Sequence, residues 1–325
     1  ISKEIIIQAI ESSLLAACKD EYGKSDNIKV IFDRETGAIG VYAEMEIVED
    51  DLLEDETTQM AFSVADAKYK NIKVGDVIDI EVTPKNFGRI AAQKAKQVVV
   101  QKIREEERKV LYVQYLEKER EVITGIVQRY SGKNVCINLG RVDAILMESE
   151  QVRGEHFRPT EHIKLYVVEV KDTPKGPRIT VSRSHPEFVK RLFEEEVTEI
   201  QDGIVTIESI AREAGSRTKI AVSTVDPNVD AVGACVGMNG SRVNAIVNEL
   251  RGEKIDIVNW SDMPEIFIEN ALSPAMVMDV SIDEYEKTAR VIVPENQLSL
   301  AIGKEGQNAR LAAKLTGYKI DIKCE

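Results

Sequence analysis

The sequence predicts a multidomain α+β protein, and three observations support this fold class. A chain of 325 residues is too long for one ordinary core, so two to four domains are expected. Residues 121–183 contain five short stretches of alternating apolar and polar residues, which is typical of strands in a small barrel. Residues 185–325 contain two copies of one pattern, a Gly-x-x-Gly loop between apolar helical stretches that ends in a strand, which indicates two related units.

The beginning of the chain predicts a helix followed by strands. Residues 28–32 and 41–45 alternate like the arms of a hairpin, and 74–82 alternates like a further strand. The acidic run at 49–56 is interpreted as a solvated loop, with a contact for a basic partner surface as the alternative. Residues 2–22 predict an amphipathic helix because apolar side chains recur at helical spacing, at Ile6, Ile10, Leu14 and Ala17.

A long charged helix is predicted next. From Ile90 to about Glu119 the sequence has helical character, and it includes the charged run at 104–109. Such a helix is typical of a rigid connector between domains. We therefore predict a first domain at residues 1–100 and a connector helix at residues 101–120.

Residues 121–184 predict an OB-fold barrel. Five strands are expected in this length, with Gly and Pro between them, and one face of such a barrel binds oligonucleotides. Aromatic rings that stack on bases and arginines that contact phosphates would hold a single strand there. The alternative is that Phe157 belongs to the core and that the charges only make the surface soluble. The predicted RNA-binding residues of the barrel are Arg129, Tyr130, Lys133, Arg141, Phe157 and Arg158.

Two related units complete the chain, at residues 185–262 and 263–325. The segment Ser184-His185-Pro186-Glu187 predicts a capping box with proline in the first turn, so a helix is expected to start there and to run to about Val197. An acidic connector around 283–286 separates the two loops. The densest basic stretch of this half contributes three more candidates for RNA contact, Arg212, Arg217 and Lys219.

The two loops are related by more than their spacing. They lie 66 residues apart, at 237–240 and 303–306, and the Lys-Ile-Asp-Ile strands at 254–257 and 319–322 lie 65 residues apart. With 19 glycines in the chain, roughly one Gly-x-x-Gly is expected by chance. A third copy, at 37–40, lies between two alternating stretches and is interpreted as a hairpin turn. The flanking sequence therefore supports the interpretation of the later pair.

A Gly-x-x-Gly loop that opens a helix is how KH domains hold a single-stranded RNA backbone, about four nucleotides per domain. Glycine lets a phosphodiester approach the backbone, and the helix N-terminus favours its negative charge. Glu305 lies at the position of Asn239 and is unfavourable beside phosphate, so the second loop is expected to depend on Lys304 and on the backbone. The predicted RNA-binding residues are Gly237, Met238, Asn239, Gly240, Ser241 and Arg242 in the first unit and Gly303, Lys304, Glu305, Gly306, Gln307, Asn308 and Arg310 in the second.

The charge of the chain limits how it can bind RNA. The net charge is −13, and residues 185–325 hold 15 basic and 24 acidic side chains. Affinity would have to come from local basic loops and from backbone amides, and non-specific binding should be weak.

Several classes of protein are excluded by absent motifs. No apolar run is long enough for a membrane span, and no signal peptide is visible. The four cysteines have no C-x-x-C spacing, which argues against zinc ribbons and disulfide frameworks and for a reducing cytosol. Lys304 is followed by glutamate, so a P-loop is absent, and there is neither a nucleophile elbow nor a paired-histidine site. We expect a cytoplasmic, monomeric protein that is not an enzyme and has neither a cofactor nor a metal.

The order of these parts, together with five long strings, resembles the NusA family of bacterial transcription elongation, termination and antitermination factors. The resemblance covers essentially the whole chain. The strings are specific, whereas an OB-fold or a Gly-x-x-Gly alone is not. They are AKYKNIKVGD at 67–76, GPRITVSRSHP at 176–186, REAGSRTK at 212–219, VGACVGMNG at 232–240 and ELRGEKIDI at 249–257.

The resemblance implies a function and partners. An N-terminal α/β domain, about 1–100, is expected to bind core RNA polymerase near the RNA exit. The OB-fold and two tandem type II KH domains are expected to form one RNA-binding surface for nascent single-stranded RNA. The implied activity is to favour pausing, assist terminator hairpins and join antitermination complexes, with other antitermination factors as further partners. The family begins upstream of Ile1, so part of the first helix is expected to be missing, and self-inhibition by C-terminal acidic repeats is not expected.

Two alternatives belong to other classes. One is a subunit of an RNA-degrading enzyme with appended KH and OB modules, but no stretch is left for a catalytic core. The other is a ribosome-associated KH protein, which would sediment with ribosomes and not with polymerase.

Overall fold

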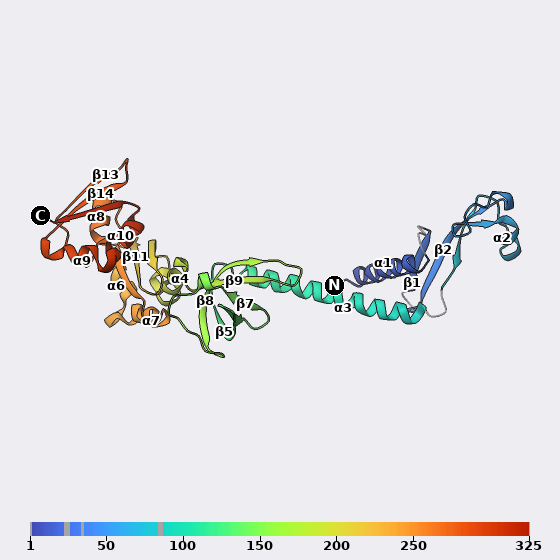
Figure 1. The fold of residues 1–325 in the computed structure, drawn as a ribbon, viewed down its shortest axis with the longest axis horizontal. Helices are drawn as coiled ribbons and strands as arrows, with labels where there is room; N and C mark the ends of the chain where they lie inside the picture. The colour runs from blue at the N-terminus through green and yellow to red at the C-terminus, as the bar shows by residue number, and fades with distance from the viewer. Residues whose placement is uncertain (1, 23–26, 34–35, 84–86, 325) are drawn as a thin grey trace. The chain divides into compact units, whose positions relative to one another are not determined.

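The computed structural model describes residues 2–22, 27–33, 36–83 and 87–324. Contacts divide the chain into two compact units, Ile1–Val110 and Leu111–Glu325, which are described separately (Figure 1). The fold is multidomain α+β, as the sequence predicts. Within the described residues, none of the helices combines the length and the apolarity that crossing a bilayer requires.

The first unit is a small sheet packed against helices. Strand β2 is central: it pairs antiparallel with β1 and β4 and parallel with β3. Ile10 and Leu14 of α1 are buried against Val41 and Ala91, which confirms the amphipathic helix, whereas the side chain of Ala17 lies outside the described residues. The elements are α1 (Lys3–Tyr22), β1 (Ile28–Phe32), β2 (Ile39–Val48), η1 (Asp50–Leu52), β3 (Gln59–Ala61), α2 (Phe62–Lys68) and β4 (Val77–Glu81).

The Gly-x-x-Gly at 37–40 belongs to a β hairpin, as predicted, and runs from the end of the turn into strand β2. Phe32 of β1 faces Ile39 of β2, and the amide of Asp33 donates to the carbonyl of Ala38 at 2.8 Å. Gly37 has a φ of 72°, which suits a tight turn. This copy of the motif therefore opens no helix.

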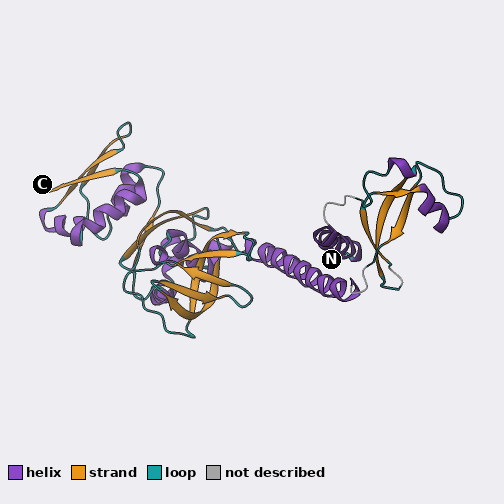
Figure 2. Cartoon of the chain, turned by 45° about the vertical axis from the view of Figure 1, so that its right-hand side comes forward, coloured by secondary structure: helices purple, strands orange, loops and turns teal. Residues whose placement is uncertain are grey.

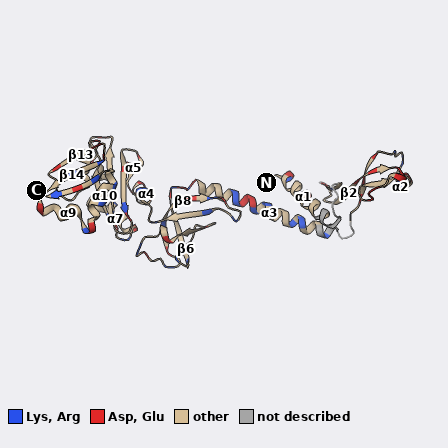
Figure 3. Ribbon diagram, turned by 45° about the horizontal axis from the view of Figure 1, so that its top comes forward, with Lys and Arg blue, Asp and Glu red and all other residues tan. Residues whose placement is uncertain are grey.

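Helix α3 (Phe87–Leu116) is the predicted charged helix. Short segments of lysine, arginine and glutamate alternate with other residues along it (Figure 3). Its first half contributes Ala91 and Ala95 to the core of the first unit. Its end contributes Leu111 and Tyr115 to the second unit, where the Tyr115 hydroxyl donates to the carbonyl of Leu139 at 2.8 Å.

The second unit begins with a closed five-stranded barrel. The strands meet in the order β5-β6-β7-β9-β8, with β7 and β9 parallel and the other neighbours antiparallel. Alternate residues point inward, among them Val135, Ile137, Leu165 and Val181. The elements are β5 (Val122–Ser131), β6 (Asn134–Asn138), β7 (Asp143–Leu146), η2 (Glu148–Glu150), β8 (His162–Lys171) and β9 (Arg178–Ser182).

The first repeat, residues 186–259, has a three-stranded sheet with helices packed on it. Strand β11 pairs antiparallel with β10 and parallel with β12. Helix α4 starts where predicted, but its cap is His185, whose Nδ1 accepts from the amide of Glu187 at 3.2 Å, and not Ser184. The elements are α4 (Pro186–Glu196), α5 (Thr198–Gln201), β10 (Val205–Glu213), β11 (Arg217–Thr224), α6 (Ala231–Val236), η3 (Met238–Gly240), α7 (Ser241–Glu249) and β12 (Lys254–Asn259).

The second repeat, residues 264–324, has the same strand pattern. Strand β14 pairs antiparallel with β13 and parallel with β15, and the helices of the repeat are grouped together on its sheet (Figure 2). Ala211, Ala221 and Val258 of the first repeat share one apolar core with the second repeat. The elements are α8 (Pro264–Ala271), β13 (Asp279–Asp283), β14 (Thr288–Val293), η4 (Glu295–Gln297), α9 (Leu298–Ile302), η5 (Lys304–Gly306), α10 (Gln307–Thr316) and β15 (Lys319–Cys324).

Candidate nucleic-acid interface

The first loop (237–240) and the second loop (303–306) have almost the same backbone. Gly237 and Gly303 have φ/ψ of 73°/170° and 75°/173°. Asn239 and Glu305 are left-handed at 53°/29° and 54°/27°, and the last glycine of each loop is at 75°/15°. Each loop follows a short helix, α6 or α9, and precedes a longer one, α7 or α10. The repeat seen in the sequence is therefore a repeat of geometry.

The first glycine of each loop is required by packing inside the repeat. A Cβ atom on Gly237 would lie 2.8 Å from Cγ of Arg242, and one on Gly303 would lie 2.8 Å from the backbone nitrogen and Cβ of Asn308. The last glycines differ: a Cβ on Gly240 would lie 3.0 Å from Nδ2 of Asn244, at the end of a side chain, whereas Gly306 has more room. A Cβ on Gly306 would meet only Nη1 of Arg310, at 3.7 Å. Substitution at the end of the second loop is therefore sterically mild.

Arg242 and Asn308 occupy the same position in the two repeats and perform the same task. Arg242 Nη1 donates to the carbonyl of Ala234 at 2.6 Å, at the end of α6, and to Glu199 at 2.8 Å. Asn308 Nδ2 donates to the carbonyl of Ala301 at 3.1 Å, at the end of α9. Each side chain thus holds the helix that precedes its loop.

This arrangement corrects one predicted site residue. Asn308 is buried, and its amide also donates to the carbonyl of Leu272 at 3.0 Å. A side chain so enclosed cannot contact RNA. The exposed side chains of the loops and of the residues that follow them are Met238, Asn239, Ser241, Lys304, Glu305 and Arg310.

Three basic residues on β10 and β11 were predicted to contact RNA, and two of them are buried, which is a second correction. Arg212 forms a bidentate ion pair with Glu253, with both N–O distances at 2.9 Å. Lys219 is fully buried and donates to the carbonyl of Ser273 at 2.8 Å and to Asp256 at 2.9 Å. Burial lowers the pKa of Lys219 despite its carboxylate partner. Arg217 is partly buried and is also paired with Asp256, so these three residues do not form a free basic surface.

The barrel residues that were predicted to bind RNA also include both exposed and buried side chains. Arg129, Tyr130, Lys133, Arg141 and Arg158 are exposed, and Lys133 is paired with Glu148 at 2.8 Å. The Tyr130 hydroxyl accepts a hydrogen bond from the amide of Phe157 at 3.0 Å. Phe157 itself is only 4% exposed and belongs to the barrel core, so its ring is not available to stack on a base. The core alternative is correct for this residue.

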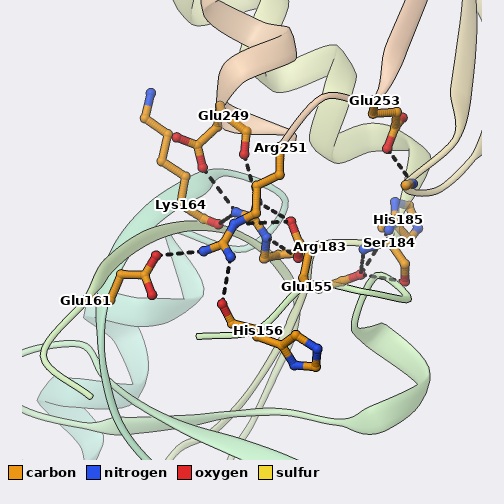
Figure 4. A network of polar contacts seen from close by, with 12 residues as sticks. Glu155, His156, Glu161, Lys164, Arg183, Ser184, His185, Glu249, Arg251 and Glu253 are labelled. Atoms are coloured by element: carbon orange, nitrogen blue, oxygen red, sulfur yellow. Dashed lines mark hydrogen bonds and ion pairs between the residues drawn. The ribbon is translucent and has the colours of Figure 1, made fainter. Parts of the chain in front are cut away.

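Sequence reasoning missed a buried cluster that joins the barrel to the first repeat (Figure 4). The guanidinium of Arg183 is bidentate to Glu155, at 2.8 and 2.7 Å, and donates to the side chain and backbone carbonyl of Glu249 at 3.1 and 2.8 Å. Nearby, Arg251 donates to the carbonyl of His156 at 2.7 Å and to Glu161 at 2.6 Å. No local sequence pattern predicts these pairs, because their members lie up to 95 residues apart in the chain.

An open groove of about 580 Å³ lies between the two repeats. Val232 of α6 and Ile257 of the edge strand β12 line one side. Asn270 and Met276 line the other. The groove thus begins beside the helix that leads into the first loop. In the described part of the chain, no cluster of three or more His, Cys, Asp or Glu residues is arranged to hold a metal ion.

Comparisons with known proteins agree on one family. Models of the NusA N-terminal domain, the NusA-like first KH domain and the NusA-like second KH domain match residues 1–109, 183–260 and 264–325. A solution structure of the N-terminal domain of NusA from Bacillus subtilis is 49% identical, covering 33% of this chain and 86% of that one, with a TM-score of 0.31.

Full-length relatives match as well, and each is named transcription termination/antitermination protein NusA. The protein from Bacillus subtilis is 55% identical over all of this chain and 87% of its own length. That from Halalkalibacterium halodurans is 53% identical over 100% and 85%, and that from Thermus thermophilus is 41% identical over 98% and 85%. This chain therefore belongs to the NusA family of transcription termination/antitermination proteins.

Proposed function

We propose that this transcription factor binds core RNA polymerase through residues 1–100 and nascent single-stranded RNA through its barrel and its two repeats, and so modulates pausing, termination and antitermination. In this division the connector is residues 101–120, the barrel domain 121–184 and the two KH domains 185–262 and 263–325. Family membership supports the partners. The observation that carries the RNA part is the shared backbone of the two loops.

The physical argument for RNA starts from the loop tips. Gly240 and Gly306 present little more than backbone at the start of α7 and α10, so a phosphate can approach the first turn of either helix. Lys304 is exposed within the second loop and supplies a positive charge. The groove next to α6 adds apolar and amide groups that suit the face and edge of a base.

Aspartate at both loop tips tests RNA binding. We expect the Gly240→Asp, Gly306→Asp double variant to bind single-stranded RNA about tenfold or more weakly, because a carboxylate would stand where the phosphate approaches. Fluorescence anisotropy with labelled RNA measures this. The matched control is the Gly252→Asp, Gly317→Asp double variant, which adds the same two charges beyond the other ends of α7 and α10, also at positive φ and with nothing within 4 Å of either new Cβ. Equal affinity of all variants would contradict the proposal.

Removal of the first compact unit tests the division of labour. A chain that starts at Leu111 keeps every element of the second unit. We expect it to lose binding to core polymerase in a pull-down and to keep its affinity for RNA. The full chain should prolong pauses on a defined template, and the shortened chain should not. Co-purification of the shortened chain with polymerase would show that residues 1–100 are not the polymerase-binding part.

A further inference from the structure

One cation of the second loop is held by an acidic residue of the other repeat. Arg310 lies in the first turn of α10, and its Nη1 donates to the carbonyl of Glu305 at 2.9 Å, within the loop. The other edge of its guanidinium faces Glu213, at the end of β10, with Nε–Oε1 at 2.6 Å and Nη2–Oε2 at 3.1 Å. The guanidinium therefore lies between the loop and a carboxylate that comes from outside the repeat.

This geometry is the one by which arginine recognises phosphate. Two parallel N–H···O bonds from one guanidinium edge serve carboxylate and phosphate equally well. A phosphate that reaches the N-terminus of α10 passes beside Arg310, and the edge it would use is filled by Glu213. Hydrogen bonds from Arg310 lower the pKa of Glu213, so this carboxylate is charged at neutral pH.

We propose that Glu213 is an internal competitor for RNA: it occupies the phosphate-binding edge of Arg310 until an RNA phosphate displaces it. This inference rests on the proposed RNA-binding function and adds a specific step to it. The first repeat lacks this device, because the residue at the position of Arg310 is Asn244. RNA binding at the second loop is thus opposed by an ion pair that crosses between the repeats, whereas the arginine after the first loop, Arg242, is paired with Glu199 of its own repeat.

The pair can open without taking the two repeats apart. The side chains of Arg310 and Glu213 are 47% and 23% exposed, and ion pairs this open to solvent add little net stability. The contact between the repeats has other members. Gln307 donates to Ser216 at 2.7 Å as well as to Glu213 at 2.9 Å, Lys219 donates to Ser273, and a shared apolar core lies behind them. Loss of Glu213's charge should therefore leave the repeats together.

The test measures RNA affinity of the Glu213→Gln variant. The probe is an unstructured, fluorescein-labelled RNA of about twelve nucleotides, which is long enough for two domains at about four nucleotides each. We expect Glu213→Gln to bind about twofold to fivefold more tightly, since one opposing, partly exposed ion pair is removed. The slope of log affinity against log salt should also steepen by up to about 0.7, the value for one additional phosphate contact on a single strand.

A double-mutant cycle identifies the partner of Glu213. Arg310→Gln should weaken RNA binding, and adding Glu213→Gln to it should have no further effect, because no guanidinium is left to release. Glu286→Gln is the matched control, since it removes the same charge from the exposed turn between β13 and β14. Its affinity should equal that of the unaltered chain. Melting temperatures of all variants check that the fold is kept.

The outcomes distinguish a failure of the competitor role of Glu213 from a failure of the proposed RNA-binding function. Unchanged or weaker binding by Glu213→Gln, or an equal gain in the Arg310→Gln background, would overturn the competitor and leave RNA binding intact. Failure of the unaltered chain and of every variant to bind the RNA would overturn the proposed function itself.

Discussion

At the scale of single residues, the first and last glycines of each loop serve different purposes. Gly237 and Gly303 make room for the side chain that holds the preceding helix, and their φ/ψ lie in a region that other residues essentially do not enter. Gly240 and Gly306 are left-handed, which other residues adopt at moderate cost. The motif thus combines a structural requirement at its first position with a less restricted glycine at its last, where the proposed RNA contact would be made.

The two glycines of the second loop should therefore differ when each is replaced by alanine. Gly303→Ala should lower the free energy of unfolding by about 2–3 kcal/mol, because of its backbone region and the contact with Asn308. Gly306→Ala should lower it by about 1 kcal/mol, the cost of the left-handed conformation alone. Urea denaturation of both variants measures the difference. Equal losses would show that the packing against Asn308 is unimportant.

Arg212 is predicted to stabilise the fold and not to contact RNA directly. Arg212→Met should lower the free energy of unfolding by about 3–5 kcal/mol, because it leaves the fully buried carboxylate of Glu253 without its cation. The exposed Arg141→Met is the control and should change stability by less than about 0.5 kcal/mol. Chemical denaturation compares them, and a small effect at Arg212 would contradict the buried-pair argument.

The reason why sequence misassigned these residues is physical. A basic residue on a strand is read as exposed unless its partner is known, and Glu253 lies 41 positions from Arg212. The exposure of Phe157 was ambiguous because its spatial neighbours were also unknown. A lone aromatic residue in a loop either belongs to the core or is available to stack on a base. The loops were predictable because their signal is local: glycine spacing, flanking helices and a closing strand all lie within one repeat.

At the scale of elements, the two repeats are alike in strand order and unlike in electrostatics. Asp256 on β12 lies among cations, with Arg217 at 2.8 Å and Lys219 at 2.9 Å. Its counterpart in the second repeat, Asp321 on β15, is mostly exposed and is paired with Lys323 at 3.3 Å. The first repeat therefore has an ion cluster between its parallel strands, at the contact with the second.

This difference predicts how stability depends on pH. Burial raises the pKa of Asp256, but hydrogen bonds and charges from Arg217 and Lys219 outweigh it and hold the pKa below the usual value for aspartate. A carboxylate with a lowered folded-state pKa stabilises the fold above its unfolded pKa, and this contribution is lost as pH falls through the folded one. The unaltered chain should thus lose stability below about pH 4 more steeply than Asp256→Asn does.

Urea titrations at steps between pH 6 and pH 3 measure that dependence. Asp321→Asn is the matched control, since it removes the corresponding carboxylate from the other repeat, where solvent screens the charge. It should follow the curve of the unaltered chain. If Asp256→Asn followed that curve too, the ion cluster would contribute nothing that depends on pH.

At the scale of the whole molecule, the second unit is held together by buried charges at its internal boundaries. Arg183 joins the barrel to the first repeat, and Lys219 joins the first repeat to the second. Each of these buried cations is paired with a carboxylate, so the interior pairs are close to neutral and the net charge of −13 falls on the remaining side chains. The proposed RNA-binding surface over barrel and repeats would need such fixed boundaries, since RNA that crosses them would otherwise have to order the domains as it binds.

Arg183 is accordingly predicted to couple the unfolding of the barrel to that of the first repeat. Its side chain is 1% exposed and that of Glu155 is 5% exposed, so Arg183→Met leaves a buried carboxylate on the barrel and removes the contacts to Glu249. Hydrogen exchange read by mass spectrometry reports the opening free energy of each part. In the unaltered chain, the slowest-exchanging amides of β5–β9 should have the same opening free energy as those of β10–β12.

In Arg183→Met the two values should separate, with the barrel strands exchanging through a lower free energy than β10–β12, because the unpaired Glu155 belongs to the barrel. Arg178→Met is the control: this arginine is exposed on β9, five residues away, and its loss should keep the two values equal. A single shared value in Arg183→Met, lowered or not, would mean that the apolar contacts of Tyr166 with Phe188 and its neighbours couple the two parts without the buried charge.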